Sequence, residues 1–542
     1  MYDGINNFTL PEWIDNETNP VGGLDLLGLR NVAQTISNHC LNGITTISPQ
    51  IRYLCLRSWF IQMYEKCNLP DNYSQFIDFS SKLEGAVAIG TLLYKPDIKG
   101  VVGGTLASDV IEESDEQVNI KRLVQQLVLN MYTGPSIDLG ICFNRNSGIT
   151  GLTKERGILL ANAVMQKSKD FEVVKKILKD KEIESFNRGE LTELGKLLSI
   201  KNIPEDEREL LIDIVVPEKA SPNGWENDIR RIASYTLLLQ LTHDHGSIPT
   251  IDDFFKVVSN LSENIHSSLN EILNGWQCYL IRDALAVSHE KALQFVVEEL
   301  KESGKIKNYR NQIIQTVMND IHSIANELLS IGIIADTNAY DDLHFIDVYN
   351  KIEAITREGN ILNEGIFRWE NQYLNESVFI ERLRTNDRGT VAIIPIMWLI
   401  SYFRLMEGLN ENIISIQLLS RGGWGRMGIK EVIIPTIQKW KKDNPLFSQV
   451  IAELIGRTVD QHVRIAWSRI ATDINRDVSV MNVDGYKWQY SKNYYGGRTA
   501  SRLEQALGWL NQLKLIDAQG ITSDGKEILN RGYKSLKKYY SN

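Results

Sequence analysis

Cations and aromatic rings alternate near the C-terminal end of the chain. The stretches Lys487–Tyr490 and Lys492–Tyr495 each begin with a lysine, and each contains two aromatic residues. Lysine can contact a phosphate and an aromatic ring can stack on a base, so this alternation suits contact with nucleic acid. The candidate contact residues in this part of the chain are Lys487, Lys492 and Tyr494.

A second group of cations surrounds an amphipathic helix that we expect over Ala500–Leu513. Its leucines and alanine recur at three- and four-residue spacing, as on one buried helix face. Arg498 and Arg502 are placed at the N-terminal end of this helix, the end with which a DNA-binding helix leads into the major groove. Further basic residues extend the candidate surface: Lys514, Lys526, Arg531, Lys534, Lys537 and Lys538.

The elements that would position these cations predict a winged helix. After the helix come a short apolar strand at Leu515–Ile516, a turn, and a threonine-capped helix start at Thr522–Gly525. A similar order occurs nearer the N-terminus, where a helix over Ile120–Met131 leads to an apolar strand at Leu139–Ile141 and a helix after Thr153. The sequence therefore predicts a second, winged-helix-like unit there.

The rest of the pattern is mainly helical. Long apolar periodicities dominate, strand-like alternation is scarce, and 13 prolines in 542 residues leave room for long helices. We expect a mainly α fold: a multi-helix body with a C-terminal winged helix and a winged-helix-like unit near the N-terminus. The expected domains are residues 1–166 (N-terminal, helical), 167–480 (helical middle) and 481–542 (C-terminal winged helix).

Charge is distributed unevenly along the chain. The formal net charge is -9, whereas residues 487–542 contain ten lysines and arginines against four acidic residues. This distribution argues against a protein that coats nucleic acid along its whole length. It predicts one basic functional end on an acidic body.

A glycine-rich segment of the predicted middle domain, Gly422–Gly428, could hold a phosphate through its backbone amides. The contributing residues would be Arg421, Gly423 and Arg426. No clear strand precedes the segment, which favours a tight turn between helices. The sequence contains no P-loop motif of the form G-x-x-x-x-G-K-[ST].

Two further polar clusters would mark an enzyme. His243–His245 has the chemistry of metal ligands, but its position at an expected helix end favours a role at the helix dipole. Arg282, Asp283, His289 and Glu290 lie on one long helix, in pairs seven residues apart, where polar packing is favoured over an acid–base site. No known catalytic motif is present, so we expect no metal and no cofactor and favour a non-catalytic protein.

Cysteine usage and hydropathy favour the cytoplasm. The five cysteines show no C-x-x-C spacing, which is typical of buried thiols in a reducing compartment. The best membrane candidate, Val391–Phe403, is 13 residues long and too short to span a bilayer. We expect it to form a buried helix, and we expect no membrane partner.

The order of winged-helix-like unit, helical middle and C-terminal winged helix resembles the kleisin-type and accessory subunits of SMC-like ATPase complexes. The residues quoted within 120–161 and 499–529 carry the resemblance, and the large middle region departs from a plain kleisin. In that family, terminal winged helices dock onto ATPase heads or touch DNA. The resemblance therefore implies a protein partner, an SMC-like ATPase, and contact with double-stranded DNA. The stretch from Gly22–Gly28 through Ile51–Trp59 also resembles bacterial antiphage-defence subunits.

The first hypothesis is a non-catalytic subunit of a bacterial DNA-associated complex, of the antiphage-defence or SMC-like ATPase kind. One alternative is a dimeric, sequence-specific transcription regulator. The other is an enzyme with a site near His243–His245 or Arg282–Glu290. A regulator should bind one duplex sequence far more tightly than others, whereas a complex subunit should bind DNA weakly alone and co-purify with an ATPase.

Overall fold

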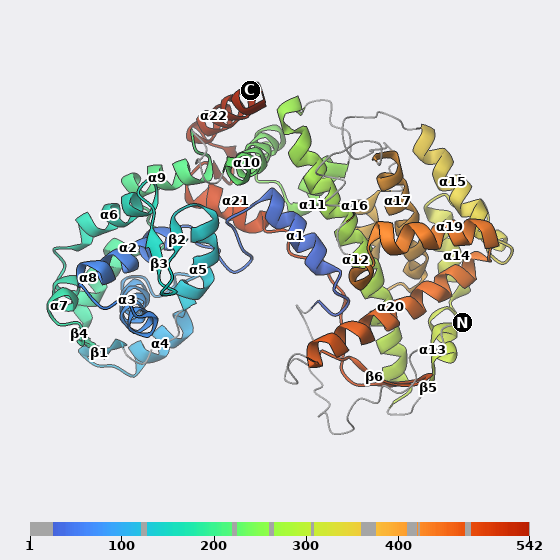
Figure 1. The fold of residues 1–542 in the computed structure, drawn as a ribbon, viewed down its shortest axis with the longest axis horizontal. Helices are drawn as coiled ribbons and strands as arrows, with labels where there is room; N and C mark the ends of the chain where they lie inside the picture. Colours follow the sequence, from blue (N-terminus) through green and yellow to red (C-terminus); the bar gives the residue numbers. More distant parts are fainter. Residues whose placement is uncertain are drawn as a thin grey trace. The chain divides into compact units, whose positions relative to one another are not determined.

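The structure, a computed structural model, is mainly helical, with a few short strands (Figure 1). The predicted mainly α fold is confirmed. The residues that the structure describes are 25–120, 127–218, 225–259, 265–304, 308–358, 375–408, 420, 423–471 and 478–540.

The chain folds into two compact units, each built from separate stretches of sequence. Unit 1 comprises Met1–Ser37 and Asp252–Ala500, and unit 2 comprises Asn38–Ile251 and Ser501–Asn542. The unit borders differ from the predicted domain borders, since residues 481–500 belong to unit 1 and the following residues to unit 2. The three-domain division stays a prediction from the sequence.

Unit 1 is built mostly from helices, together with one small antiparallel sheet of strand order β5-β7-β6. Helices α1 (Arg30–Cys40) and α11 (Ile251–Ser259) each contain a unit border. The other elements are η2 (Ser267–Leu269), α12 (Asn270–Glu302), β5 (Asn308–Tyr309), α13 (Arg310–Val317), α14 (Ile321–Ser330), η3 (Thr337–Tyr340), α15 (Phe345–Glu358), α16 (Glu376–Leu383), η4 (Arg388–Ala392), α17 (Ile393–Gly408), η5 (Trp424–Arg426), η6 (Ile429–Ile433), α19 (Ile434–Asp443), α20 (Phe447–Ile470), β6 (Met481–Asp484) and β7 (Lys487–Tyr490).

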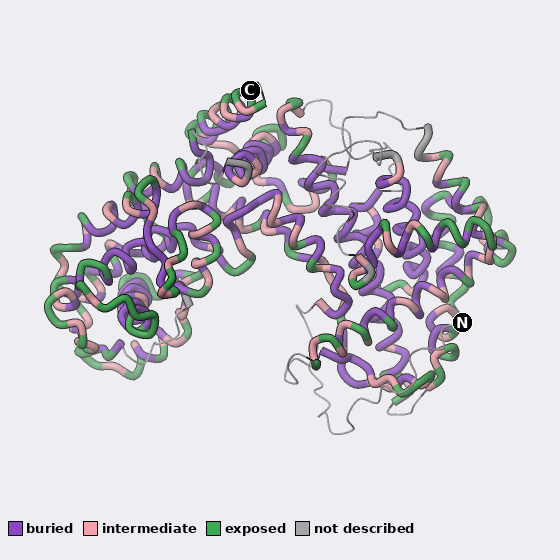
Figure 2. Tube along the Cα trace, in the orientation of Figure 1, coloured by how far each residue is buried: buried purple, intermediate pink, exposed green. Residues whose placement is uncertain are grey.

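Helix α12 is the central element of unit 1. It is 33 residues long, and every residue from Ile272 to Val297 is buried (Figure 2). A helix that is buried on all sides must be surrounded by other elements, and α16, α17 and α20 all pack against it. Its polar side chains therefore need partners inside the protein, because an unpaired buried polar group costs free energy.

Helix α17 belongs to the one segment within the described residues that is long and apolar enough to cross a membrane. That segment, Arg388–Met406, has a mean hydropathy of 1.6, and 94% of it is buried inside the protein. The buried helix predicted at Val391–Phe403 is therefore confirmed. A long apolar helix buried in this way is typical of the core of a soluble protein.

Unit 2 contains helices and three two-stranded antiparallel sheets, β1-β4, β2-β3 and β8-β9. Its elements are α2 (Tyr53–Lys66), α3 (Tyr73–Tyr94), α4 (Gly104–Glu112), β1 (Gln117–Asn119), α5 (Leu127–Asp138), β2 (Cys142–Asn144), β3 (Thr150–Leu152), α6 (Gly157–Ser168), α7 (Glu172–Lys179), β4 (Ser185–Asn187), α8 (Arg188–Leu198), α9 (Glu205–Val215), α10 (Trp225–His245), α21 (Leu503–Gln512), β8 (Ile516–Asp517), β9 (Gly520–Ile521) and α22 (Ser523–Tyr540).

Close backbone contact and a buried ion pair hold the helices of unit 2 together. Helices α3 and α8 cross at Gly90 and Gly195, where a Cβ on Gly195 would lie 1.8 Å from the Gly90 carbonyl oxygen. The side chains of Arg52 and Glu207 are both completely buried, and the Arg52 guanidinium donates to both carboxylate oxygens of Glu207, at 2.9 and 3.0 Å. The same guanidinium donates to the carbonyl oxygen of Asn202 at 2.9 Å, so its burial is compensated by several partners.

The C-terminal elements follow the predicted order of helix, strand, turn and helix, but the first helix is shorter than expected. It begins at Leu503 rather than Ala500, because Arg502 has a left-handed φ of 67° that cannot continue a right-handed helix. It ends in a Schellman motif, in which Lys514 at φ 57° donates to Asn511 and the Leu515 N–H donates to the Leu510 carbonyl. Whether this module is a winged helix stays a prediction.

The winged-helix-like unit predicted near the N-terminus agrees less well with the structure. Residues 121–126 of the helix expected over Ile120–Met131 lie outside the described residues, and the helix that the structure describes, α5, continues to Asp138. The strand expected at Leu139–Ile141 begins instead at Cys142. Helix α5 contains Pro135 and extends seven residues beyond the predicted end at Met131.

Candidate functional site

Helix α22 in unit 2 is amphipathic, and its buried stripe attaches it to α10 and the β8-β9 hairpin. The stripe recurs at three- and four-residue spacing, as expected for one helix face. Its members are Gly525, Ile528, Leu529, Gly532 and Leu536.

Two glycines of this stripe allow the helix to approach its neighbours closely. A Cβ added at Gly525 would lie 2.0 Å from the carbonyl oxygen of Leu515, and one added at Gly532 would lie 2.1 Å from Oγ1 of Thr236 on α10. The hydroxyl of Tyr533 donates to Oε1 of Gln240, also on α10, at 2.9 Å. Helix α22 is therefore fixed in rotation, which determines the side chains it presents to solvent.

The opposite face of α22 is basic, and we call it the lysine face. It consists mostly of lysines, with one acidic residue among them, at helical spacing and all exposed: Lys526, Glu527, Asn530, Lys534, Lys537 and Lys538. Lys537 and Lys538 also occupy the last turn of the helix, where positive charge interacts favourably with the helix dipole. Exposed ammonium groups on one rigid helix form a row of point charges suited to a polyanion.

The flanks of α22 carry ion pairs rather than free cations. Arg531 pairs with Asp213 of α9, so this predicted contact residue already has a carboxylate partner. Arg208 of α9 pairs with Asp524 in the first turn of α22 and also donates to the Leu513 carbonyl at 2.8 Å. These pairs anchor the edges of the helix and leave the lysine face as its exposed charge.

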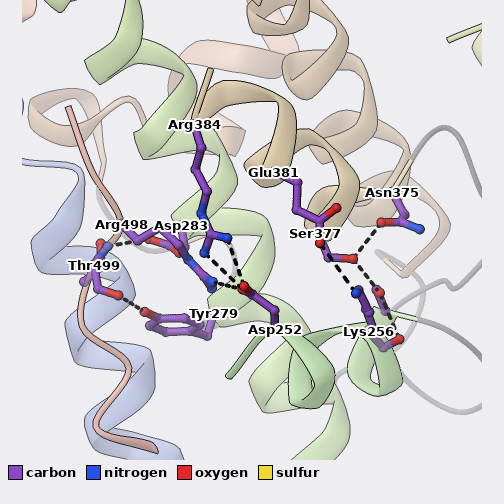
Figure 3. A network of polar contacts seen from close by, with 11 residues as sticks. Asp252, Lys256, Tyr279, Asp283, Asn375, Ser377, Glu381, Arg384, Arg498 and Thr499 are labelled. Atoms are coloured by element: carbon purple, nitrogen blue, oxygen red, sulfur yellow. Dashed lines mark hydrogen bonds and ion pairs between the residues drawn. The ribbon is translucent and has the colours of Figure 1, made fainter. Parts of the chain in front are cut away.

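Both arginines that were predicted to lead into DNA are hydrogen-bonded to other residues of the protein. Arg498 lies in unit 1, where its guanidinium donates to Asp283 at 3.0 Å and to Asp252 at 2.9 Å (Figure 3). It also lies over the ring of Phe255, 4.9 Å from the centroid. Arg384 forms a two-pronged pair with the same Asp252 carboxylate, and these hydrogen bonds and charges lower the pKa of Asp252.

Arg502 lies in unit 2 and is also engaged. Its guanidinium donates to Oδ1 of Asn38 at 2.5 Å and to the carbonyl oxygen of Ile44 at 2.7 Å. Its backbone has the left-handed conformation that precedes α21. Arg498 is therefore bound within unit 1 and Arg502 within unit 2, so each of the two arginines already has partners in its own unit.

The mixed cation–aromatic stretch belongs to unit 1 and is partly buried. Lys492 and Tyr494 are buried, and burial raises the pKa of Tyr494. Trp488 is also buried, beneath the guanidinium of Arg310. Lys487 reaches the surface and lies 5.1 Å from the ring centroid of Tyr309. Of the predicted residues in this stretch, Lys487 is therefore the one placed to meet a ligand.

Lys514 is exposed at the end of α21, as the surface prediction requires. The sequence signal that predicted a basic surface here was the cluster of Lys526, Arg531, Lys534, Lys537 and Lys538 near the C-terminus. The acidic partners that occupy Arg498 and Arg531 gave no such signal, because they lie hundreds of positions away in sequence.

The glycine-rich segment of unit 1 forms a tight turn whose carbonyl groups receive hydrogen bonds from buried side chains. Arg282 on α12 donates to the carbonyl of Arg426 at 3.2 Å, and Gln461 donates to that of Gly425 at 3.0 Å. The amide of Gly428 donates back to the Gly423 carbonyl at 2.7 Å. Arg421 lies outside the described residues, and the phosphate-loop hypothesis stays a prediction.

The histidine cluster at the end of α10 is exposed. His245 contacts the Ser247 hydroxyl through Nδ1 at 2.8 Å, and Gln240 donates to Asp244 at 2.7 Å. Within the described ranges, no group of three or more His, Cys, Asp or Glu side chains could hold a metal ion.

The polar residues of α12 are joined to neighbouring helices. Trp398 of α17 donates to Nε2 of His289 at 2.8 Å, and Nδ1 of His289 lies 2.7 Å from Oγ1 of Thr458 on α20. An indole N–H can only donate, so the neutral imidazole carries its hydrogen on Nδ1 and donates it to Thr458. Burial, together with the charge of Arg282, lowers the pKa of His289 to about 3. His289 therefore links helices α12, α17 and α20 by hydrogen bonds in the core of unit 1.

Glu290, the remaining acidic group of that cluster, is completely buried and pairs with Arg30 of α1. It also accepts the backbone N–H of Gly497 at 3.0 Å. Its carboxylate oxygens are thus occupied by the protein itself, as are those of Asp283. The geometry on α12 matches the polar packing that the sequence favoured over an acid–base site.

No protein-family model, no curated protein and no solved structure matches the chain.

Proposed function

We propose that this protein is a non-catalytic subunit of a bacterial, cytoplasmic DNA-associated complex and that the lysine face of α22 contacts the phosphates of double-stranded DNA. The complex would be of the antiphage-defence or SMC-like ATPase kind, with the ATPase as the protein partner. The observation that carries the proposal is the row of exposed lysines on a helix whose other face is locked against α10.

The difference between the exposed lysines of α22 and the engaged arginines favours contact with the DNA backbone over reading of base edges. Arginine forks are the usual readers of guanine in the major groove, and both Arg498 and Arg502 already have partners in the protein. Lysine acts on a phosphate as a point charge and carries little sequence information. Weak, sequence-tolerant binding is what a subunit of a larger assembly requires, whereas a dimeric regulator needs specific base contacts.

The experiment is a salt titration of duplex binding followed by fluorescence anisotropy, with two duplexes of unrelated sequence. The triple variant Lys526→Gln, Lys534→Gln, Lys538→Gln removes three charges of the lysine face. Each lost phosphate contact should flatten the slope of log K against log salt concentration by about 0.9. The slope of the triple variant should therefore be shallower than that of the wild-type protein by about 2.7. The wild-type protein should bind both duplexes with similar affinity.

A matched control removes the same charge elsewhere. Lys430, Lys439 and Lys442 are exposed lysines of unit 1, and their replacement by glutamine should leave the slope unchanged. Arg498→Gln should also leave it nearly unchanged, because the arginine is neutralised by two carboxylates. Equal losses in the lysine-face and control variants would show that net charge, and not this face, binds DNA.

A further inference from the structure

A short extended segment in unit 1 is bound to α12 almost entirely by side chains. This strap, Gly496–Thr499, belongs to neither a helix nor a strand. The Gly496 N–H donates to Gln294 at 3.2 Å, the Gly497 N–H to Glu290 at 3.0 Å, and the Thr499 N–H to Asp283 at 2.8 Å. Three of the four backbone N–H groups of the strap thus donate to side chains of α12.

The receiving side chains form one stripe on α12. Tyr279, Asp283, Glu290 and Gln294 are separated by four, seven and four residues, which places them on a single helix face. The hydroxyl of Tyr279 donates to the Thr499 carbonyl (Figure 3). The order of the partners is reversed: Gly496 at the start of the strap bonds to Gln294, the last residue of the stripe, and Thr499 bonds to Asp283 and Tyr279, the first two.

Glycine at the start of the strap permits this close fit. A Cβ on Gly496 would lie 3.0 Å from the carbonyl carbon of Glu290 and 3.1 Å from its oxygen, tighter than ordinary van der Waals contact. Arg30 of α1 closes the other side, since its guanidinium pairs with Glu290 and donates to the Gly497 carbonyl at 3.0 Å. The backbone of the strap thus lies directly against the helix.

Arg498 supplies the part of the attachment that solvent can reach. The Asp283 side chain is completely buried, but those of Arg498 and Asp252 are 18% and 36% exposed. Ion pairs at the surface are weakened by salt far more than buried ones are. The strap therefore combines buried anchoring groups with one solvent-accessible, charge-dependent bond.

We propose that Gly496–Thr499 is an electrostatic latch on α12, which opens locally when Arg498 loses its contact with Asp252, while unit 1 remains folded. The stripe on α12 holds the backbone in place, and the Arg498–Asp252 pair sets how often the strap detaches. Because the strap belongs to no strand, its attachment depends on these side-chain bonds, and loss of one of them raises the population of the open state.

Limited trypsin digestion of the full-length protein tests the latch, because trypsin can cleave after Arg498 only when the strap leaves α12. The released fragment begins at Thr499 and is followed by mass spectrometry, with rates normalised to an unstructured peptide substrate. Asp252→Asn should raise the cleavage rate about fivefold, the factor expected for loss of about 1 kcal/mol. Raising the salt concentration should increase the wild-type rate and have less effect on the variant.

Arg384→Gln is the matched control within the same cluster. It removes the other cation bound to Asp252 but leaves both carboxylate partners of Arg498 in place, so the cleavage rate should not rise. Circular dichroism must show the same helix content in all variants. The latch is overturned if Asp252→Asn leaves cleavage unchanged, if Arg384→Gln raises it equally, or if cleavage rises only when helix content falls.

Discussion

Gly532 of α22 lies so close to Thr236 of α10 that a Cβ at position 532 would come within 2.1 Å of the threonine Oγ1. The hydroxyl cannot simply turn away, because it donates to the Ile232 carbonyl at 2.6 Å. Close approach of these two residues fixes the rotation of α22 and with it the direction of the lysine face.

Replacing Gly532 by alanine should therefore destabilise unit 2. In an exposed helix the same change would stabilise the protein by up to about 1 kcal/mol, but overpacking here should cost about 1–3 kcal/mol. Urea unfolding monitored by circular dichroism measures the difference. The cost should shrink in a Thr236→Ala background, which removes the clashing atom. An equal cost in both backgrounds would contradict the close contact.

The contact of Trp398 with His289 predicts a specific pH dependence of stability. The pKa of His289 is about 3 in the folded protein, below its ordinary value, so the folded state binds fewer protons than the unfolded state. The contribution of neutral His289 to the free energy of unfolding is complete above about pH 6.5 and is lost as the pH falls toward 3. Between pH 7.5 and 5.5 the loss from this residue should be about 1.4 kcal/mol.

His289→Gln should abolish that part of the pH dependence, whatever its effect on stability at neutral pH. Urea unfolding at both pH values gives the comparison, and only the difference between the two pH values is used. A variant that loses as much stability on acidification as the wild-type protein would show that His289 is not held neutral.

Loss of one partner of the buried Arg52–Glu207 pair should be costly. Glu207→Gln leaves a completely buried guanidinium without its countercharge, and such an unpaired charge typically costs about 3–5 kcal/mol. The matched surface change is Glu172→Gln, whose partner Lys175 is half exposed, and it should cost less than about 1 kcal/mol. In thermal unfolding, the wild-type protein should have the highest midpoint, Glu172→Gln a slightly lower one and Glu207→Gln the lowest. Similar midpoints for the two variants would contradict the burial of the pair.

Lys514→Gly should stabilise the C-terminal part of unit 2. Lys514 has a φ of 57° at the end of α21, a conformation that costs a residue with a Cβ about 1 kcal/mol relative to glycine. A rise in the urea midpoint would confirm it. Asn511→Gly, inside the last turn of the helix, is the control and should lower the midpoint instead.

The sequence predicted the broad fold because local patterns carry that information. A short apolar run predicted the buried helix at Val391–Phe403, and the cluster of basic residues near the C-terminus included Lys526, Lys534 and Lys538. The same reasoning placed Arg498 on the α21 helix, which was wrong. The left-handed conformation of Arg502 delays the start of that helix to Leu503, and the side-chain type of an arginine does not indicate such a conformation.

Spacing and composition along the chain were sufficient to predict a mainly helical fold and a basic C-terminal end. Which of those charges are neutralised depends on the tertiary structure. Arg498 and Arg531 look as basic in the sequence as Lys534 does, yet folding brings Asp283 and Asp213 to them across more than two hundred residues. Neutralisation depends on distance in space, and sequence spacing does not encode it.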